Sequence, residues 1–155
     1  MLPEVVIEST DAGCARTLFS LTSDAAGSAK QLASILDTLP AGEIFVQDHA
    51  ALRGLIQAAG VAREIRWSSQ GGPREVSQAT ISLAEALVAQ TGSIFVTAAC
   101  GGRGVSVVAP CHIVYGKTNQ LVPDLKTALG SASSNGVIIS RVIVWTARTQ
   151  KNVRS

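Results

Sequence analysis

The chain has 155 residues, of which 46% are hydrophobic, 15% are charged and 4% are aromatic, and its formal net charge is +2. These values predict one globular domain whose core is built from Ala, Val, Ile and Leu. The small charge argues against a nucleic-acid-binding protein, which needs clustered Lys and Arg. The basic residues of the tail, Arg148, Lys151 and Arg154, are better explained by a solvated terminus.

The cysteines bear on compartment and cofactors. Cys14, Cys100 and Cys111 form no Cys-x-x-Cys pair, which argues against a disulfide framework, a zinc site or an iron–sulfur cluster within the chain, so no metal or cofactor is predicted. The first ten residues lack the basic region and apolar core of a signal peptide. No apolar run reaches the roughly 20 residues that a membrane helix needs. We therefore expect a cytoplasmic protein that does not contact a membrane.

The first 21 residues do not clearly predict a secondary structure, whereas the residues that follow predict a helix. Residues 5–7 could form a short strand, and the apolar residues between positions 18 and 21 could pack against a helix or a partner chain, so a homodimer is one expectation. The helix that follows is expected to begin at Thr22 or Ser23 and to end before Pro40. Its buried face is predicted by residues at helical spacing, namely Leu32, Ile35, Leu36 and Leu39.

A strand–helix–strand unit is predicted between positions 43 and 67. Residues 43–47 read as a strand, Asp48 as the cap of a helix, Gly60 as the end of that helix, and residues 62–67 as a second strand. The short connections favour parallel strands joined by a right-handed crossover.

The second half of the chain is organised around residues 88–116. This stretch reads as a strand, a glycine-rich loop, a short turn of helix and another strand, and residues 94–96 are expected to be a buried strand of the α/β sheet. Residues 75–90 are ambiguous between strand and helix. A helix is predicted over residues 120–130, and residues 137–146 form one strand or two.

Together these elements predict an α/β protein, with residues 1–155 forming a single domain. Its sheet is expected to be mainly parallel, with helices on both faces. In such folds, polar residues in the loops at strand ends are the usual ligand contacts.

The first candidate ligand contacts lie in two loops. Thr91, Gly92 and Ser93 could present two hydroxyls and a backbone N–H to a phosphate or a carboxylate. A tight entry to a strand would also explain the glycine. Arg103, within Gly-Gly-Arg-Gly, could supply a forked donor to an anion and is the strongest single candidate for a ligand contact.

His112 is the candidate catalytic residue. An imidazole titrates near neutrality, so His112 could act as a general acid or base or contact an anion, whereas the alternative is a histidine hydrogen-bonded at a strand edge. Its neighbour Cys111 is not expected to be a nucleophile paired with His112, because adjacent strand residues point to opposite faces.

Several motifs occur in a fixed order in the second half. They are residues 87–93 (LVAQTGS), the strand 94–96, residues 102–107 (GRGVSV), residues 109–114 (APCHIV) and residues 121–125 (LVPDL). This series resembles the LUD domain family, which includes lactate utilization protein C. The signature region spans about residues 79–146 of this LUD-like domain.

The resemblance implies a fold similar to the superfamily of ribose-5-phosphate isomerase and coenzyme A transferases. It also implies a subunit for lactate utilization that acts with iron–sulfur partner proteins in the oxidation of lactate to pyruvate. One alternative is a stand-alone enzyme or sensor that binds an anionic small molecule such as a sugar phosphate, a carboxylate or a CoA ester. The other is a non-catalytic interaction module.

Two departures from the family pattern bear on these alternatives. Gln90 stands where the family has glutamate, and the family's Gly-Pro-Ser-Arg-Thr loop is missing after Gly136. Both departures favour the interaction module over the stand-alone enzyme.

Overall fold

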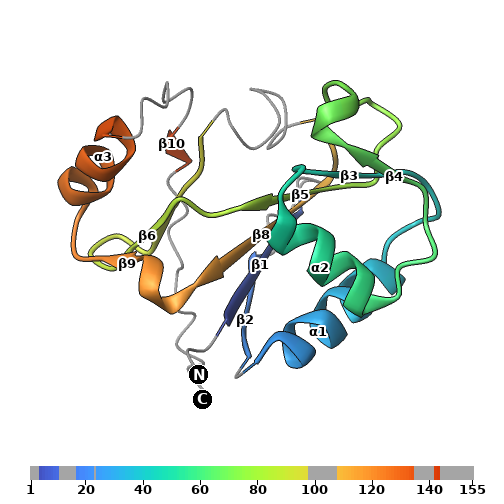
Figure 1. Cartoon of the computed structure of the whole chain (residues 1–155), viewed down its shortest axis with the longest axis horizontal. Coiled ribbons are helices and arrows are strands. Elements are labelled where there is room, and N and C mark those ends of the chain that lie inside the picture. The colour runs from blue at the N-terminus through green and yellow to red at the C-terminus, as the bar shows by residue number, and fades with distance from the viewer. Residues whose placement is uncertain (1–3, 11–16, 23, 98–107, 135–141, 144–155) are drawn as a thin grey trace, which may run out of the picture.

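The computed structural model describes residues 4–10, 17–22, 24–97, 108–134 and 142–143 (Figure 1). Within these segments the chain forms two sheets, one of six strands and one of four. The larger sheet has the order β2 (Thr17–Thr22), β1 (Glu4–Thr10), β8 (Cys111–Lys117), β5 (Ala79–Leu83), β3 (Ile44–Val46) and β4 (Ile65–Trp67).

The larger sheet confirms the α/β class and the mainly parallel sheet. Strands β8, β5, β3 and β4 pair in parallel, with Cys111 opposite Ala79 and Ala79 opposite Ile44. Strand β1 joins them antiparallel to β8, and β2 is antiparallel to β1. Because parallel strands share a direction, the carboxyl ends of β3, β5 and β8 meet at one edge of the sheet.

Helices α1 (Ala25–Asp37) and α2 (Ala50–Ala59) pack against each other and against one face of the larger sheet. Figure 1 places them together on one side of β5 and β8. The cap of α1 is Asp24, whose carboxylate accepts a hydrogen bond from the N–H of Gly27 at 2.7 Å, so the expected cap at Thr22 or Ser23 is wrong. A short polar side chain one position later satisfies the same free N–H groups.

Helix α2 connects β3 to β4 and confirms the predicted strand–helix–strand unit. It ends at Gly60, which adopts the left-handed conformation with φ of 62°. Its cap, however, is His49 and not Asp48.

The smaller sheet has the order β10 (Val142–Ile143), β7 (Ser93–Phe95), β6 (Ala86–Val88) and β9 (Leu121–Val122). The strand expected at residues 94–96 therefore pairs antiparallel with β6 and does not belong to the larger sheet. The helix expected from residue 120 begins only at Leu125, because Leu121 and Val122 form β9. This helix, α3 (Leu125–Ser134), continues past Gly130 and packs on β6 and β9.

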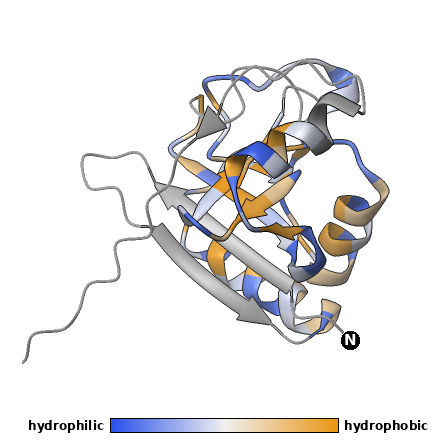
Figure 2. Cartoon of the chain, turned by 90° about the vertical axis from the view of Figure 1, so that its left-hand side faces the viewer, coloured by the Kyte–Doolittle hydropathy of each residue, from blue (hydrophilic) through white to orange (hydrophobic). Residues whose placement is uncertain are grey.

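The two faces of the larger sheet bury different side chains. Ile81 and Ile113 face the core with α1 and α2, and Figure 2 shows hydrophobic segments gathered in this interior. On the opposite face, Val114 packs with Ile94 and Val96 of the chain that forms the smaller sheet. We expected helices on both faces of one sheet. In the structure, α1 and α2 share one face of the larger sheet, and α3 packs on the smaller sheet.

We predict that the central strands set the stability of the domain. Ile81 is fully buried, so Ile81→Ala should lower the free energy of unfolding by about 2–5 kcal/mol through lost apolar burial and the cavity left behind. Val76→Ala is the matched control, because Val76 is 61% exposed and should change stability by less than about 0.5 kcal/mol. Urea denaturation measures both, and equal losses would contradict the assignment of the core.

Candidate functional site

A cavity of about 350 Å³ opens at the carboxyl ends of β3, β5 and β8, and we call it the strand-end cavity. It is lined by Gln47, His49, Ala51, Leu83, Ala84, Glu85, Tyr115, Lys117, Asn119 and Gln120. These residues come from the last positions of the three strands and from the segments that follow them. This edge is where open α/β sheets bind ligands.

Two glutamine side chains hold the ends of the three strands together. The side-chain oxygen of Gln47, just after β3, accepts a hydrogen bond from the N–H of Leu83 at the end of β5, at 2.8 Å. The Gln120 oxygen accepts from the N–H of Lys117 at 2.7 Å, and its amide nitrogen donates to the carbonyl of Ala84 at 2.7 Å. The cavity wall is thus fastened by side-chain bonds to backbone groups that the strands leave unpaired.

Asp48 fastens the loop between β3 and α2. Its carboxylate accepts two hydrogen bonds from Arg53, at 2.6 and 2.8 Å, and one from the Ser69 hydroxyl, while its N–H donates to the Ser68 hydroxyl at 2.8 Å. These contacts, led by the bond from Arg53, lower the pKa of Asp48 to about 2. The Arg53 guanidinium also lies 4.2 Å from the centroid of the Trp67 ring. The loop that carries Gln47 and His49 is therefore tied to β4 and the turn after it.

His49 presents a hydrogen-bond donor at the cavity. Its Nδ1 accepts a hydrogen bond from the N–H of Ala51 at 3.1 Å, which places the proton of the neutral ring on Nε2. Ala51, in the first turn of α2, also lines the cavity, so the positive end of that helix dipole lies beside it. An imidazole N–H and a helix amino end both favour a negatively charged ligand.

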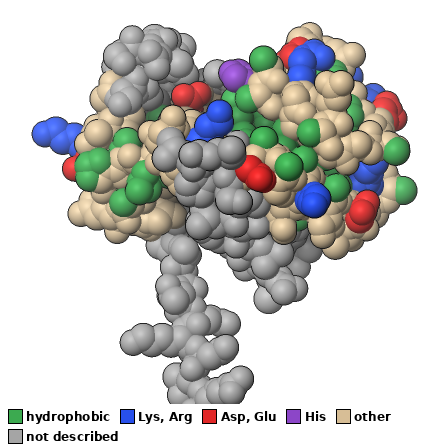
Figure 3. Space-filling view, turned by 60° about the horizontal axis from the view of Figure 1, so that its bottom comes forward, with side chains coloured by type: hydrophobic (Ala, Val, Ile, Leu, Met, Phe, Trp, Pro, Cys, Tyr) green, Lys and Arg blue, Asp and Glu red, His purple; other side chains and the backbone are tan. Residues whose placement is uncertain are grey.

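Lys117 and Glu85 bring one positive and one negative charge to the cavity. Both residues are exposed, and the Thr97 hydroxyl donates to the Glu85 carboxylate at 3.3 Å. No ion pair joins Lys117 to Glu85 in the part of the chain that the structure describes. Elsewhere, Figure 3 shows Lys and Arg side chains interspersed with Asp and Glu side chains on one face of the molecule.

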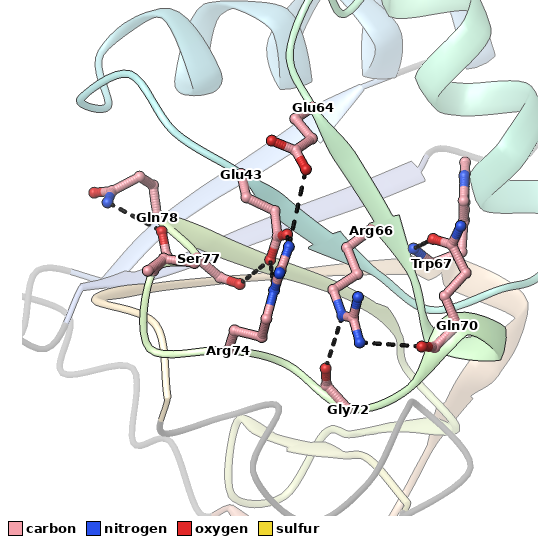
Figure 4. A network of polar contacts seen from close by, with 10 residues as sticks. Glu43, Glu64, Arg66, Trp67, Gln70, Gly72, Arg74, Ser77 and Gln78 are labelled. Carbon is pink, nitrogen blue, oxygen red and sulfur yellow. Dashed lines mark hydrogen bonds and ion pairs between the residues drawn. The ribbon is translucent and has the colours of Figure 1, made fainter.

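A polar network lies at the amino ends of β3, β5 and β4 (Figure 4). Glu43, which precedes β3 and is 4% exposed, accepts hydrogen bonds from Arg74 and from the Ser77 hydroxyl, the latter at 2.8 Å. Glu64 approaches Arg74 at 3.8 Å. The buried carboxylate is therefore paired within the chain, as buried charges must be, and this end of the sheet offers no open charge at Glu43.

His112 lies near the start of β8 and does not line the strand-end cavity. It is 3% exposed, and its Nε2 lies 2.8 Å from the Ser82 hydroxyl. Burial lowers the pKa of His112 to about 4, so the ring is neutral at pH 7. Cys111 is buried in the core with α1 and α2, which agrees with the expected opposite orientation of the two neighbours.

The other predicted contacts lie in the smaller sheet or outside the described residues. Thr91 and Gly92 belong to the turn between β6 and β7, where the Thr91 hydroxyl donates to the Ser93 hydroxyl at 2.6 Å. Gly92 has φ of 65°, and its N–H donates to Val88 at 2.9 Å, so the turn itself requires the glycine. Arg103 lies outside the described residues. The ligand roles of these residues and of His112 remain predictions.

Sequence reasoning did not choose the cavity residues as ligand contacts, because no motif marks them, and it gave His49 and Glu85 surface positions. Their common signal is position, since Gln47, Glu85 and Lys117 each end or follow a strand of the parallel set. That signal could be used only once the strand order was known.

The fold and the cavity define an α/β protein with a cavity at the carboxyl ends of its parallel strands, and a comparison with family models bears on its family. Residues 72–138 match the family model of the LUD domain, and this match supports membership of the LUD domain family. The LUD domain is associated with lactate utilization proteins. No curated protein and no solved structure matches the chain. Within the described segments, none of the helices has the length and apolar character needed to span a membrane.

We predict that His112 makes the domain sensitive to acid. Its folded pKa of about 4 lies below the ordinary value of 6.5, so its contribution is fully present above pH 6.5 and is lost as the pH falls toward 4. This single group should remove roughly 3 kcal/mol from the free energy of unfolding between pH 7 and pH 4.

The measurement is urea denaturation across this pH range. His112→Gln should flatten the dependence, whereas Lys126→Gln, at an exposed position on α3, should leave it as in the wild type. An unchanged slope in His112→Gln would show that other groups cause the acid sensitivity.

Proposed function

We propose that this chain is a LUD-type subunit for lactate utilization that binds a small organic anion in the strand-end cavity. The observation that carries this proposal is the meeting of Lys117, His49 and the amino end of α2 at one cavity of about 350 Å³. A cavity of this size lies at the lower end of the range typical of small-ligand sites.

Each of the three groups suits a carboxylate. The Lys117 ammonium supplies a full positive charge and three donors, and the Nε2–H of His49 supplies another donor. The helix amino end adds partial positive charge, and the effect is strongest within its first turn. A carboxylate that enters the cavity would form charge-assisted hydrogen bonds, which are shorter and stronger than neutral ones.

The role in lactate utilization rests on membership of the LUD domain family. Oxidation of lactate to pyruvate removes two electrons and two protons, so an electron acceptor must take part. The sequence contains no Cys-x-x-Cys pair that would suggest a cluster of its own. We therefore propose that iron–sulfur partner proteins accept the electrons, as the resemblance implies, while this chain holds the organic anion.

Lys117→Gln tests the anion site. Removing the ammonium should weaken the binding of lactate by at least about tenfold, as expected for the loss of one charge-assisted hydrogen bond. Calorimetric titration of the full chain with lactate, pyruvate and inorganic phosphate measures the effect. Lys126→Gln is the matched control, because Lys126 is exposed on α3 and does not line the cavity. Equal affinity in both variants would refute the site, and tighter binding of phosphate would favour a phosphorylated ligand.

Electron transfer tests the proposed partners. The chain is expressed in its native host with an affinity tag and purified with its bound proteins. Addition of lactate should then reduce iron–sulfur clusters in the preparation, as seen by bleaching of their visible absorption, and the Lys117→Gln preparation should react at least about tenfold more slowly. A preparation that contains clusters but shows no response to lactate would contradict this role.

A further inference from the structure

The strand-end cavity contains two opposite charges that the described chain does not pair with each other. Lys117 is the last residue of β8, and Glu85 follows β5, its parallel neighbour. Both line the cavity, and neither belongs to an ion pair among the described residues. Glu85 retains acceptor capacity, because a carboxylate accepts about four hydrogen bonds and Thr97 supplies one, at 3.3 Å.

The backbone explains why the two charges remain separate. Leu83 and Tyr115 are opposite in the parallel ladder, and the N–H of Ala84 still donates to the Tyr115 carbonyl at 2.8 Å. One residue later the chain departs, because the N–H of Glu85 donates to Phe95 of the smaller sheet, also at 2.8 Å. From this point β5 and β8 no longer run side by side.

The Gln120 side chain then bridges the two diverging strands. Its two hydrogen bonds reach the carbonyl of Ala84 on one side and the N–H of Lys117 on the other, each at 2.7 Å. Lys117 itself and Glu85, which follows Ala84, therefore lie in sequence at the two backbone groups that this bridge joins. The oxygen and the nitrogen of the Gln120 amide are both used in this bridge. The charged groups at the cavity that could contact a ligand are those of Lys117 and Glu85.

We infer that the strand-end cavity selects small carboxylic acids that carry a hydrogen-bond donor, a hydroxyl or an ammonium, on the carbon next to the carboxylate. This inference rests on the proposed function, in which Lys117 binds the carboxylate of the ligand. Glu85 is then the residue whose carboxylate accepts the hydrogen bond from the donor on the neighbouring carbon. A carboxylate site accepts a hydroxyl or ammonium proton, whereas a methylene leaves it without a partner. A carbonyl oxygen at that position would face a second acceptor and be repelled. Sites built to hydrogen-bond a ligand group discriminate against analogues that lack it.

Four acids of nearly equal size test the inference, because they differ only at the second carbon. Propionate has a methylene there, lactate a hydroxyl, pyruvate a carbonyl and alanine an ammonium. Calorimetric titration into the full chain should give at least about tenfold tighter binding for lactate, alanine or both than for propionate, with pyruvate the weakest. The better of lactate and alanine identifies the donor that Glu85 prefers.

Glu85→Gln removes the charge, keeps the shape and adds an amide donor. The preference for a donor over the carbonyl of pyruvate should fall by at least about tenfold, because the new amide N–H can donate to that oxygen. Glu75→Gln is the control, since Glu75 is exposed and does not line the cavity, and it should keep the wild-type order. Because Glu85 is exposed, the ligand-free melting temperature should not change, which verifies that the variant is folded.

The outcomes separate this inference from the proposed function. If all four acids bind equally, or if Glu85→Gln keeps the wild-type order, the role of Glu85 is refuted while the anion site at Lys117 stands. If none of the four acids binds, both proposals fail. If the order holds in the wild type and in Glu75→Gln and is lost in Glu85→Gln, the inference is supported.

Discussion

The parallel pairing of β3, β5 and β8 is the constraint on which the rest of the molecule depends. These strands are buried, with Ile44, Ile81 and Ile113 at most 1% exposed. Their common direction brings three chain segments, distant in sequence, to one edge of the sheet. Every residue that lines the strand-end cavity belongs to, or lies close in sequence after, one of these strands. The site is thus a consequence of strand direction and not of any single loop.

Charged side chains at the two ends of the parallel strands differ in burial and in pairing. At the amino ends, the buried carboxylate of Glu43 is matched by Arg74 and Ser77, as the cost of burying an unpaired charge requires. At the carboxyl ends, Lys117 and Glu85 remain exposed to solvent, so no such pairing is required. Water screens them until a ligand replaces it. Charges that a ligand could contact are therefore present at the carboxyl ends, whereas the charge of Glu43 is already paired.

The sequence predicted those parts of the fold that local patterns determine. The buried face of α1, the crossover through α2 and the stop at Gly60 follow from helical spacing and glycine geometry. The hairpin of β6 and β7 could not be separated from the main sheet, because a short apolar strand reads the same in either sheet. The cap of α2 was misassigned because Asp48 and His49 can both cap, and the choice depends on Arg53 and Ser69, of which Ser69 is distant in sequence. The cavity could not be predicted at all, since its charges come from strands whose order is a tertiary property.

Gln47 and Gln120 hold the backbone of the cavity wall, whereas other residues carry its charges, and this separation affects how the ligand preference can change in evolution. These glutamines use their side chains to hold backbone groups, so their substitution would disturb the scaffold. The charged residues of the cavity, Lys117 and Glu85, are exposed, and exposed positions usually tolerate replacement at little cost in stability. The ligand preference of the cavity can therefore change through one or two surface substitutions while the sheet beneath remains intact. Proteins with this scaffold can therefore come to bind a different metabolite while they keep the same fold.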